Sequence, residues 1–163
     1  MTTIYAQPLT AEAFAPFGEV IAATTPDPKI INQGKCKRHH DLAKLDFIEG
    51  RAGVSIFHAE PRTLPYTLDL LERHPEGSQC FMPMSMDPFL VIVAEDAGNT
   101  PGQVHAFITE PGQGINFHRN TWHGVLTPLH APGLFAVIDR IGDGPNLQEY
   151  PLENPLRIDI KPL

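Results

Sequence analysis

Hydrophobic residues in this chain occur in short runs, and most of the runs alternate with polar residues. Alternation at every second position is typical of half-buried β-strands, because successive side chains of a strand point to opposite faces. The short runs that we interpret as strands are residues 19–21, 29–32, 53–59, 66–74, 79–82, 89–94, 104–109, 134–140 and 156–161. Between them lie most of the 17 prolines and 13 glycines. The pattern predicts an all-β protein, a barrel or sandwich of many short strands.

Three segments add detail to this prediction. Residues 89–94 are apolar throughout, so both faces of this strand should be covered, as in the centre of a sheet. The tail at residues 156–161 alternates cleanly and predicts an edge strand with one solvated face. Thr10 can cap a short helix over residues 11–15, and Glu12 in its first turn suits the positive end of the helix dipole.

Length and charge limit the kinds of protein that fit. The 163 residues predict a single domain spanning residues 1–163. A formal net charge of −7 argues against nucleic acid or an anionic membrane as a partner. A small anionic ligand still fits, because a few arginines can make a local positive pocket. We expect no signal peptide at residues 1–8 and no membrane span, since the longest apolar run is far too short.

The two cysteines indicate a compartment. Cys36 and Cys80 lack the spacing of a zinc site or of a disulfide framework. Two isolated thiols fit a reducing cytoplasm better than a secreted scaffold. We therefore expect a cytoplasmic protein.

The strand expected over residues 66–74 ends in side chains that can do chemistry. The side chains that share one face of a regular strand here are Leu68, Leu70, Glu72 and His74. Residues 75–78 contain a proline and a glycine, which favour a tight turn. We expect a hairpin that folds Gln79 back near His74. The alternative is a hairpin whose Glu72 and His74 only cap a sheet edge.

A second polar segment, residues 111–124, contains two histidines. His118 and His123 are five residues apart, with Arg119 and the only tryptophan, Trp122, between them. Two imidazole-bearing turns flanked by apolar strands are what a small β-barrel needs to form a pocket at its mouth.

Two further segments hold charged candidates. Residues 35–42 are basic, and within them Arg38, His40 and Asp41 are candidates for the site or for a subunit contact, whereas a solvated loop is the alternative. Arg140 ends the strand at residues 134–140. It could form a weak surface ion pair with Asp139 or deliver a guanidinium to the barrel mouth.

The two polar segments resemble the two motifs of the cupin superfamily. In the first motif, His74 fits the second histidine, Glu72 stands for the first histidine, and Gln79 stands for the glutamate. In the second motif, Gly112 and His123 take the glycine and histidine positions, whereas His118 and Asn120 replace a proline and a glycine. The resemblance implies a cupin-like β-barrel of the jelly-roll type, with a short N-terminal helix.

A narrower resemblance covers nearly the whole chain. The stretches that carry it are Arg38-x-His40-Asp41-Leu42-Ala43, Leu71-Glu72-Arg73-His74-Pro75-x-Gly77-x-Gln79-x-Phe81-x-Pro83, Gly114-x-Asn116, Trp122-His123 and Ile138-Asp139-Arg140. In this order and spacing they resemble the ureidoglycolate lyase family, also known as ureidoglycolate hydrolases. The resemblance implies a homodimeric cytoplasmic enzyme of allantoin and purine degradation. The implied reaction cleaves (S)-ureidoglycolate to glyoxylate and urea.

This substrate defines the groups that a site must supply. One carbon of ureidoglycolate bears a hydroxyl, a carboxylate and a urea nitrogen, so cleavage needs a base, an acid and a clamp for the carboxylate. Histidines suit proton transfer near neutral pH, and the arginine fork matches a carboxylate.

We assign the candidate roles on this basis. His74 and His123 are the first general acid–base candidates, and His118 and Glu72 are the second. Gln79 can bind the urea amide or the hydroxyl. The clamp candidates are Arg119, Arg38, Arg73 and Arg140. Among them, Arg73 should point away from His74 on a regular strand.

A metal ion stays an open question at this point. Glu72, His74, Gln79 and His123 could hold Ni²⁺, Mn²⁺ or Zn²⁺ with an open position for substrate. Glutamine is a weak ligand, however, and the cupin pattern has lost one histidine and one glutamate. The histidines and arginines could also act without a metal.

Two other kinds of function compete with the lyase. One is another cupin enzyme, a metal-dependent isomerase or dioxygenase, which the changes at Glu72 and Gln79 disfavour. The other is a binding module that holds a small acid without converting it. Release of glyoxylate from ureidoglycolate separates the lyase from both.

Overall fold

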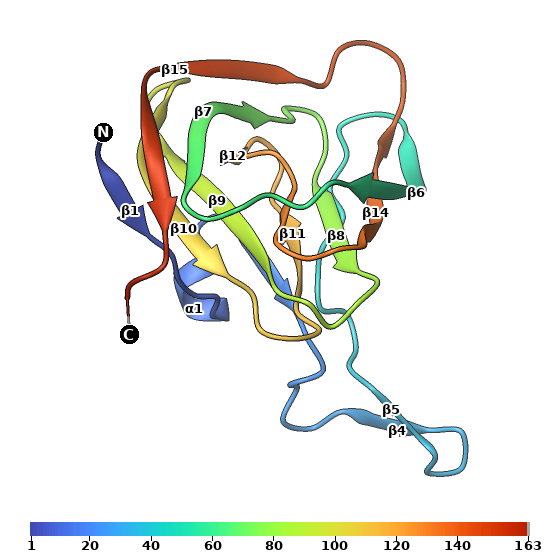
Figure 1. Ribbon diagram of the computed structural model, residues 1–163. Helices are drawn as coiled ribbons and strands as arrows, with labels where there is room; N and C mark the ends of the chain where they lie inside the picture. The colour runs from blue at the N-terminus through green and yellow to red at the C-terminus, as the bar shows by residue number, and fades with distance from the viewer. Residues whose placement is uncertain (163) are drawn as a thin grey trace.

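The computed structural model describes residues 1–162, and nearly all of its regular secondary structure is β-strand (Figure 1). The strands are β1 (Thr3–Tyr5), β2 (Gln7–Pro8), β3 (Gly18–Ile21), β4 (Lys29–Ile31), β5 (Cys36–Arg38), β6 (Arg51–Ala59), β7 (Tyr66–Arg73), β8 (Gln79–Pro83), β9 (Phe89–Asp96), β10 (Pro101–Ile108), β11 (Gly114–Phe117), β12 (Trp122–His123), β13 (Thr127–Pro128), β14 (Gly133–Ile141) and β15 (Gln148–Asp159). The short helix α1 (Ala11–Phe14) begins after Thr10, whose hydroxyl accepts a hydrogen bond from the Ala13 amide. The predicted all-β barrel with a short N-terminal helix is confirmed.

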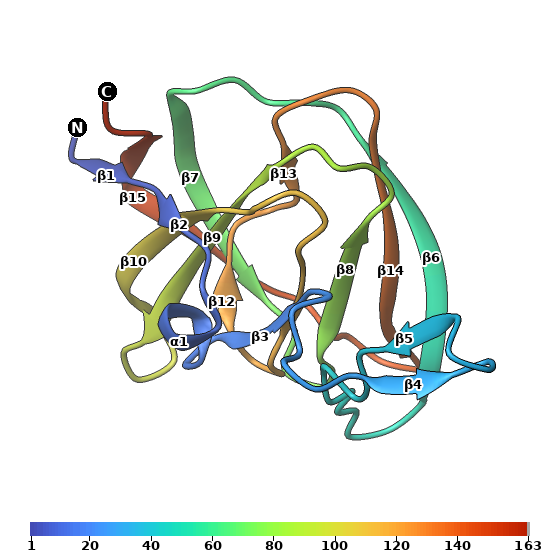
Figure 2. The same cartoon turned by 90° about the horizontal axis from the view of Figure 1, so that it is seen from below.

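The strands form two sheets that face each other across the barrel. The larger sheet has the order β1-β15-β7-β12-β9-β10-β2, with β13 paired to β9. The smaller sheet has the order β3-β11-β8-β14-β6. Strands β4 and β5 pair only with each other among the described strands. Figure 1 shows them as a separate ribbon below the barrel, and in Figure 2, seen from below, they lie in front of the ends of β6 and β14. We call residues 29–38 the arm.

Aromatic side chains fill the space between the sheets. Phe89 and Phe135 meet edge-on with ring centroids 4.9 Å apart, and Phe81 meets Phe117 in the same way at 5.9 Å. Such edge-to-face contacts stabilise a core beyond the burial of apolar area alone. Strand β9 is buried on both faces from Phe89 to Ala94, as its unbroken apolar sequence predicts.

Two predicted strand relationships are wrong. Strands β7 and β8 do not form a hairpin, because β7 belongs to the larger sheet and β8 to the smaller one. The turn at residues 74–78 therefore crosses from one sheet to the other at the barrel mouth. Strand β15 is not an edge strand, because β1 pairs with it in parallel, with Thr3 opposite Arg157.

The predicted face of β7 is also interrupted. Leu68 and Leu71 belong to one buried cluster, although a regular strand would place them on opposite faces. The pairing of β7 with β15 is irregular at the same place, with a register shift between Pro151 opposite Leu70 and Leu156 opposite Leu68. Glu72 and His74 follow after this irregularity.

No helix within residues 1–162 is both long enough and apolar enough to span a lipid bilayer.

Arg140 ties together three loops at the barrel mouth. Its Nε donates to the Glu49 carbonyl at 2.6 Å, and its Nη2 donates to the Asp143 carbonyl at 3.0 Å. The same Nη2 lies 2.9 Å from a carboxylate oxygen of Glu76, while the Arg140 side chain is 3% exposed. At Gly77 a Cβ would lie 2.8 Å from the Arg140 Cβ, so this glycine lets the turn approach the arginine.

We predict that Arg140→Ala lowers the free energy of unfolding by about 2–4 kcal/mol, because two carbonyls and one carboxylate lose a buried charged donor. Arg140→Lys should recover only part of this loss, since an ammonium lacks the planar fork. Urea denaturation followed by circular dichroism measures both. The exposed Arg51 on β6, changed to alanine, serves as the control and should shift stability by less than about 0.5 kcal/mol. Equal stability of Arg140→Ala and wild type would show that other contacts hold these loops.

Candidate active site

Glu72, His74 and His123 come together at the barrel mouth. Each offers one ligand atom, and these atoms all lie within 4.8 Å of one another. Strand pairing produces this cluster, because His123 on β12 lies directly opposite Glu72 on β7. His74 follows β7, and its ring centroid is 5.2 Å from that of His123. The structure thus brings together side chains from the two polar segments that the sequence analysis singled out.

Backbone carbonyls fix the tautomer of both imidazoles. His74 Nδ1 lies 2.8 Å from the carbonyl oxygen of Asn146, and His123 Nδ1 lies 2.8 Å from that of Gly124. A carbonyl oxygen can only accept a hydrogen bond, so each Nδ1 carries the proton and donates it. In a neutral imidazole the Nε2 atom then keeps a free lone pair. Both Nε2 atoms are buried and have no hydrogen-bond partner within residues 1–162, which leaves two lone pairs available to a ligand.

Burial sets the charge of this cluster. Desolvation, with a smaller effect of the neighbouring His74, lowers the pKa of His123 to about 3, whereas the bond to the Gly124 carbonyl opposes the shift. His123 is therefore neutral near pH 7. Burial also raises the pKa of the Glu72 carboxyl, an effect that His74 opposes and Glu149 adds to. A carboxyl with a raised pKa can release and take up a proton nearer to neutral pH.

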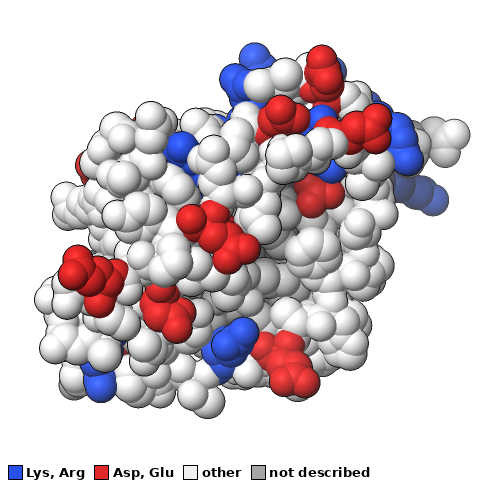
Figure 3. Space-filling view, turned by 90° about the horizontal axis from the view of Figure 1, so that it is seen from above, with Lys and Arg blue, Asp and Glu red and all other residues white. Residues whose placement is uncertain are grey.

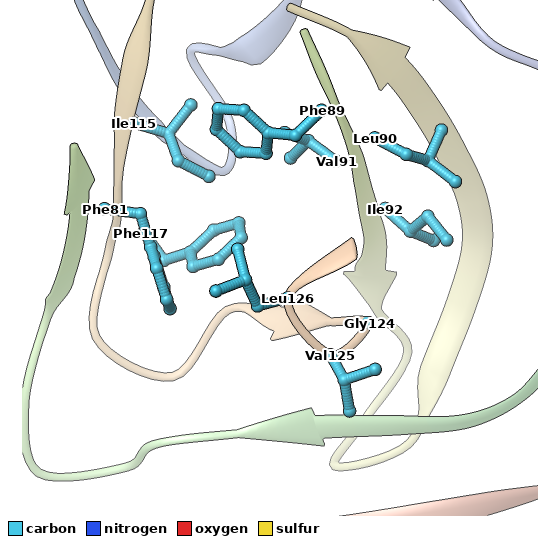
Figure 4. A pocket seen from close by; sticks show the side chains of 10 residues that line it. All are labelled: Phe81, Phe89, Leu90, Val91, Ile92, Ile115, Phe117, Gly124, Val125 and Leu126. Carbon is cyan, nitrogen blue, oxygen red and sulfur yellow. The ribbon is translucent and has the colours of Figure 1, made fainter. Parts of the chain in front are cut away.

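Phe117 forms the floor of the cluster. Its ring stacks on the His123 imidazole with the centroids 4.3 Å apart and the planes 8° apart. Below it lies an apolar cavity of about 10 Å³. Figure 4 shows Phe81, Ile115, Phe89 and Leu126 among the side chains that face this space, whereas Leu90 and Ile92 extend to the other side of β9. A cavity of this size holds about one water molecule. Any larger ligand must therefore bind on the mouth side of Phe117.

Gln79 faces the same interior from the smaller sheet. It lies directly opposite Phe117 in the pairing of β8 with β11. Its Nε2 donates to Asp139 Oδ2 at 3.1 Å, while its Oε1 is buried without a partner. Asp139 is not among the site residues predicted from the sequence. Its place near the end of the β14 strand is visible in the sequence, but its neighbour on β8 is not.

His118 and Arg119 lie in the loop between β11 and β12 and form a different surface. His118 Nε2 is 3.4 Å from Glu19 Oε2, and Arg119 Nε is 3.4 Å from Asp46 Oδ2. Both line an open groove of about 800 Å³, the other lining residues being Glu19, Asp41, Ala43, Lys44, Leu45, Asp46 and Ser78. The Asn120 amide, next to Arg119, donates to the His74 carbonyl at 2.9 Å, so this groove, which we call the mouth groove, adjoins the mouth from the outer face of the smaller sheet, where Glu19 lies opposite Asn116.

The other three clamp candidates lie outside this groove. Arg73 points to the outer face of β7, where its guanidinium lies 4.3 Å over the Trp122 ring and its Nε donates to Gln148 Oε1 at 2.7 Å. Arg140 holds the mouth loops together, and Arg38 is exposed on the arm. The arm lies in the lower part of Figure 1, whereas β7 and β12 lie in its upper part. Of the four clamp candidates, Arg119 alone lines the mouth groove among the described residues.

The mouth face is mixed in charge. Figure 3 views the molecule from the upper side of Figure 1 and shows acidic side chains on several parts of this face, with the surface hollowed between them. This fits the net charge of −7 and a small ligand held by local groups.

Comparisons with known proteins agree along nearly the whole chain. A family model described as ureidoglycolate lyase matches residues 1–159. The chain is 60% identical to the ureidoglycolate lyase of Rhodobacter capsulatus over 160 residues, which cover 98% of this chain and 99% of that protein. It is 51% identical over 162 residues to the ureidoglycolate lyase of Chelativorans sp., covering 98% of each chain. It is 49% identical over 162 residues to that of Mesorhizobium japonicum, covering 98% of this chain and 99% of that protein.

Proposed function

The chain belongs to the ureidoglycolate lyase family, and we propose that it cleaves (S)-ureidoglycolate to glyoxylate and urea. The observation that best supports this activity is the pair of imidazoles whose free Nε2 lone pairs lie beside the Glu72 carboxyl. Lone pairs and a carboxyl of raised pKa are the groups that move a proton from one atom of a substrate to another.

The reaction is an elimination that balances without water. The O–H bond of the hydroxyl breaks as the C=O bond of glyoxylate forms. The C–N bond breaks at the same carbon, and the departing nitrogen gains a proton to become urea. One proton leaves oxygen and one reaches nitrogen, so the site needs an acceptor and a donor close together. Positioned acid–base groups of this kind contribute about 10²–10⁴-fold to a rate.

The structure supports a division of roles within the cluster. His74 Nε2 accepts the hydroxyl proton, and Glu72 delivers a proton to the departing nitrogen, because its carboxyl has a raised pKa. His123 is too weak a base for proton transfer, since its pKa is about 3, and its lone pair instead orients a ligand. Arg119 clamps the substrate carboxylate from the mouth groove. His118, which lies against Glu19, has no role in proton transfer in this proposal.

The same donor set fits a divalent metal ion. Metal-binding histidines usually donate their second ring N–H to a carbonyl or carboxylate, as His74 and His123 do here. Glu72, His74 and His123 would hold the ion, and Ni²⁺, Mn²⁺ or Zn²⁺ bound there would polarise the substrate's carboxylate or hydroxyl. Ligation and proton transfer use the same lone pairs, so the metal content of the protein decides between the two uses of His74.

The outer face of the smaller sheet supports a homodimer. Val54 and Ile56 on β6 are 74% and 56% exposed. Their partners in register on β14 are Ile138 and Ala136, so the solvent side of this sheet is apolar where polar residues are expected. Among the strands that the structure describes, β6 is also an edge of that sheet. A second copy would cover the patch, and exposed patches of this kind mark interfaces.

The family and the cysteines support a cytoplasmic enzyme. Release of glyoxylate and urea suits the degradation of allantoin and purines. Cys36 and Cys80 are free thiols, which suits the reducing cytoplasm.

We predict that His74→Asn lowers the kcat for glyoxylate release about 10²–10⁴-fold. The asparagine amide can still donate to the Asn146 carbonyl, so the substitution removes Nε2 and little else. His123→Asn, designed in the same way toward the Gly124 carbonyl, should cost less, about 10-fold, because it removes a lone pair that orients the ligand and not a proton acceptor. The control is His130→Asn, because His130 is exposed in the loop between β13 and β14 and is not part of the cluster. Folded His74→Asn and His123→Asn variants with near-normal turnover would remove both imidazoles from the mechanism.

For the metal, elemental analysis and calorimetric titration of the stripped protein with Ni²⁺, Mn²⁺ or Zn²⁺ decide between the two uses of the cluster, and one ion bound per chain would assign the Nε2 lone pairs of His74 and His123 to the metal. Glu72→Gln should weaken this binding about 10- to 100-fold or more, because it removes the anionic ligand. Glu95→Gln changes an exposed acid outside the cluster and should leave binding unchanged. A protein that binds none of these ions would assign both imidazoles to the substrate and its protons.

For the dimer, light scattering of the wild-type protein should give twice the mass of the chain. Ile56→Lys should give the mass of one chain with the same circular dichroism spectrum, since it places a charge in the apolar patch. Ile160→Lys, at another exposed isoleucine, is the matched control and should remain a dimer. A monomeric wild type, or an Ile56→Lys dimer, would contradict this interface.

A further inference from the structure

The Gln79 amide is held in one orientation. Its Nε2 donates to Asp139 Oδ2 at 3.1 Å. A carboxylate has no proton to donate, so the amide nitrogen must face Asp139 and the amide oxygen must face away. The opposite orientation would place two acceptors against each other. The Asp139 carboxylate thus decides which end of the Gln79 amide is presented to a ligand.

The presented atom is a buried acceptor without a donor. Gln79 is 6% exposed, and its Oε1 has no hydrogen-bond partner in the structure. A buried polar atom left unpaired costs about 1–3 kcal/mol, which a ligand with an N–H or O–H donor would recover. The register that places Gln79 opposite Phe117, and the stacking of Phe117 on His123, put this acceptor on the interior side of the barrel mouth.

The surrounding groups discriminate between the two ends of the substrate. His74 Nε2 and His123 Nε2 are also unpaired acceptors in their neutral tautomers. Among the described residues, the unpaired buried atoms at the interior of the mouth are therefore all acceptors, unless an imidazole takes up a proton. A carboxylate would meet repulsion there, because it too only accepts. A ureido group carries three N–H bonds and matches this arrangement. The carboxylate end fits better at the mouth groove beside Arg119.

We propose that Asp139 is a positioning residue that turns the Gln79 carbonyl toward the ureido group of the substrate, and that this oxygen accepts a hydrogen bond from a ureido N–H. Asp139 itself touches no substrate. The inference rests on the proposed function, since it names the part of ureidoglycolate that this pair recognises. It separates the two ends of the substrate, with the ureido end at Gln79 and the carboxylate end at Arg119.

Hydantoate tests this proposal directly. It keeps the ureido group and the carboxylate of ureidoglycolate but lacks the hydroxyl, so the elimination cannot occur. Glyoxylate keeps the carboxylate and has no ureido group. Calorimetric titration of the full-length protein with each acid therefore separates recognition of the two ends.

Asp139→Leu should weaken hydantoate binding about 10- to 100-fold, because the Gln79 amide loses its fixed orientation. Glyoxylate affinity should change by less than about twofold. Asp139→Asn should stay within about threefold of wild type for hydantoate, since its amide oxygen can still accept from Gln79 Nε2. Gln79→Met should lower hydantoate affinity as much as Asp139→Leu does. The double variant should lose no more hydantoate affinity than either single variant, because the two residues act as one unit. With ureidoglycolate, Asp139→Leu should raise KM more than it lowers kcat.

Several outcomes would overturn the proposal. Equal loss of hydantoate and glyoxylate affinity in folded Asp139→Leu would make Asp139 a structural residue of the mouth. Unchanged hydantoate affinity, or additive losses in the double variant, would separate Asp139 from Gln79. A change in metal affinity alone would assign Gln79 Oε1 to an ion. Failure of the proposed function is distinct, because it appears as a wild-type protein that releases no glyoxylate from ureidoglycolate, whatever the hydantoate pattern.

Discussion

Two hydrogen bonds from imidazole rings to backbone carbonyls determine what the barrel mouth can do. His74 donates Nδ1–H to Asn146 and His123 donates Nδ1–H to Gly124, each at 2.8 Å. Without these bonds the rings could present N–H groups inward, and the mouth would offer donors. With them it offers lone pairs, which suit a proton, a metal ion or the N–H groups of a urea. The chemistry of the site is thus set by main-chain atoms that lie outside it.

The rest of the barrel keeps these rings in place and dry. Phe117 stacks on His123 and separates the mouth from the aromatic core, so burial lowers the pKa of that imidazole. Arg140 binds the loop at residues 142–147, which supplies the Asn146 carbonyl, to the turn at residues 76–78. Gln79 and Asp139 close the opposite wall from the smaller sheet. The walls of the site come from different parts of the chain. The crossing between the two sheets at residues 74–78 brings the end of β7 and the start of β8 to the same site.

Much of this could be predicted from sequence, and the parts that could not have a physical reason. Short hydrophobic runs between turn residues identified β7, β8, β9 and β14, and the two imidazole-bearing segments predicted that His74 and His123 meet. Alternation also showed that Arg73 points away from His74. A proline–glycine turn does not reveal whether the next strand pairs with the last one or joins another sheet, so the hairpin prediction is wrong. The imidazoles bond to backbone carbonyls, which leave no mark in the side-chain sequence. Asp139 gains its role only from Gln79 on the paired strand β8, a contact that the sequence does not reveal.

The account predicts a definite protonation pattern, which nuclear magnetic resonance of ¹⁵N-labelled histidines measures. In the free protein, at a pH where both rings are neutral, His74 and His123 should each show a protonated Nδ1 and an unprotonated Nε2, and both Nε2 resonances should shift when hydantoate or a divalent ion is added. A proton on Nε2 of either neutral ring would contradict the account. So would Nε2 resonances of both rings that stay unchanged with every one of these ligands.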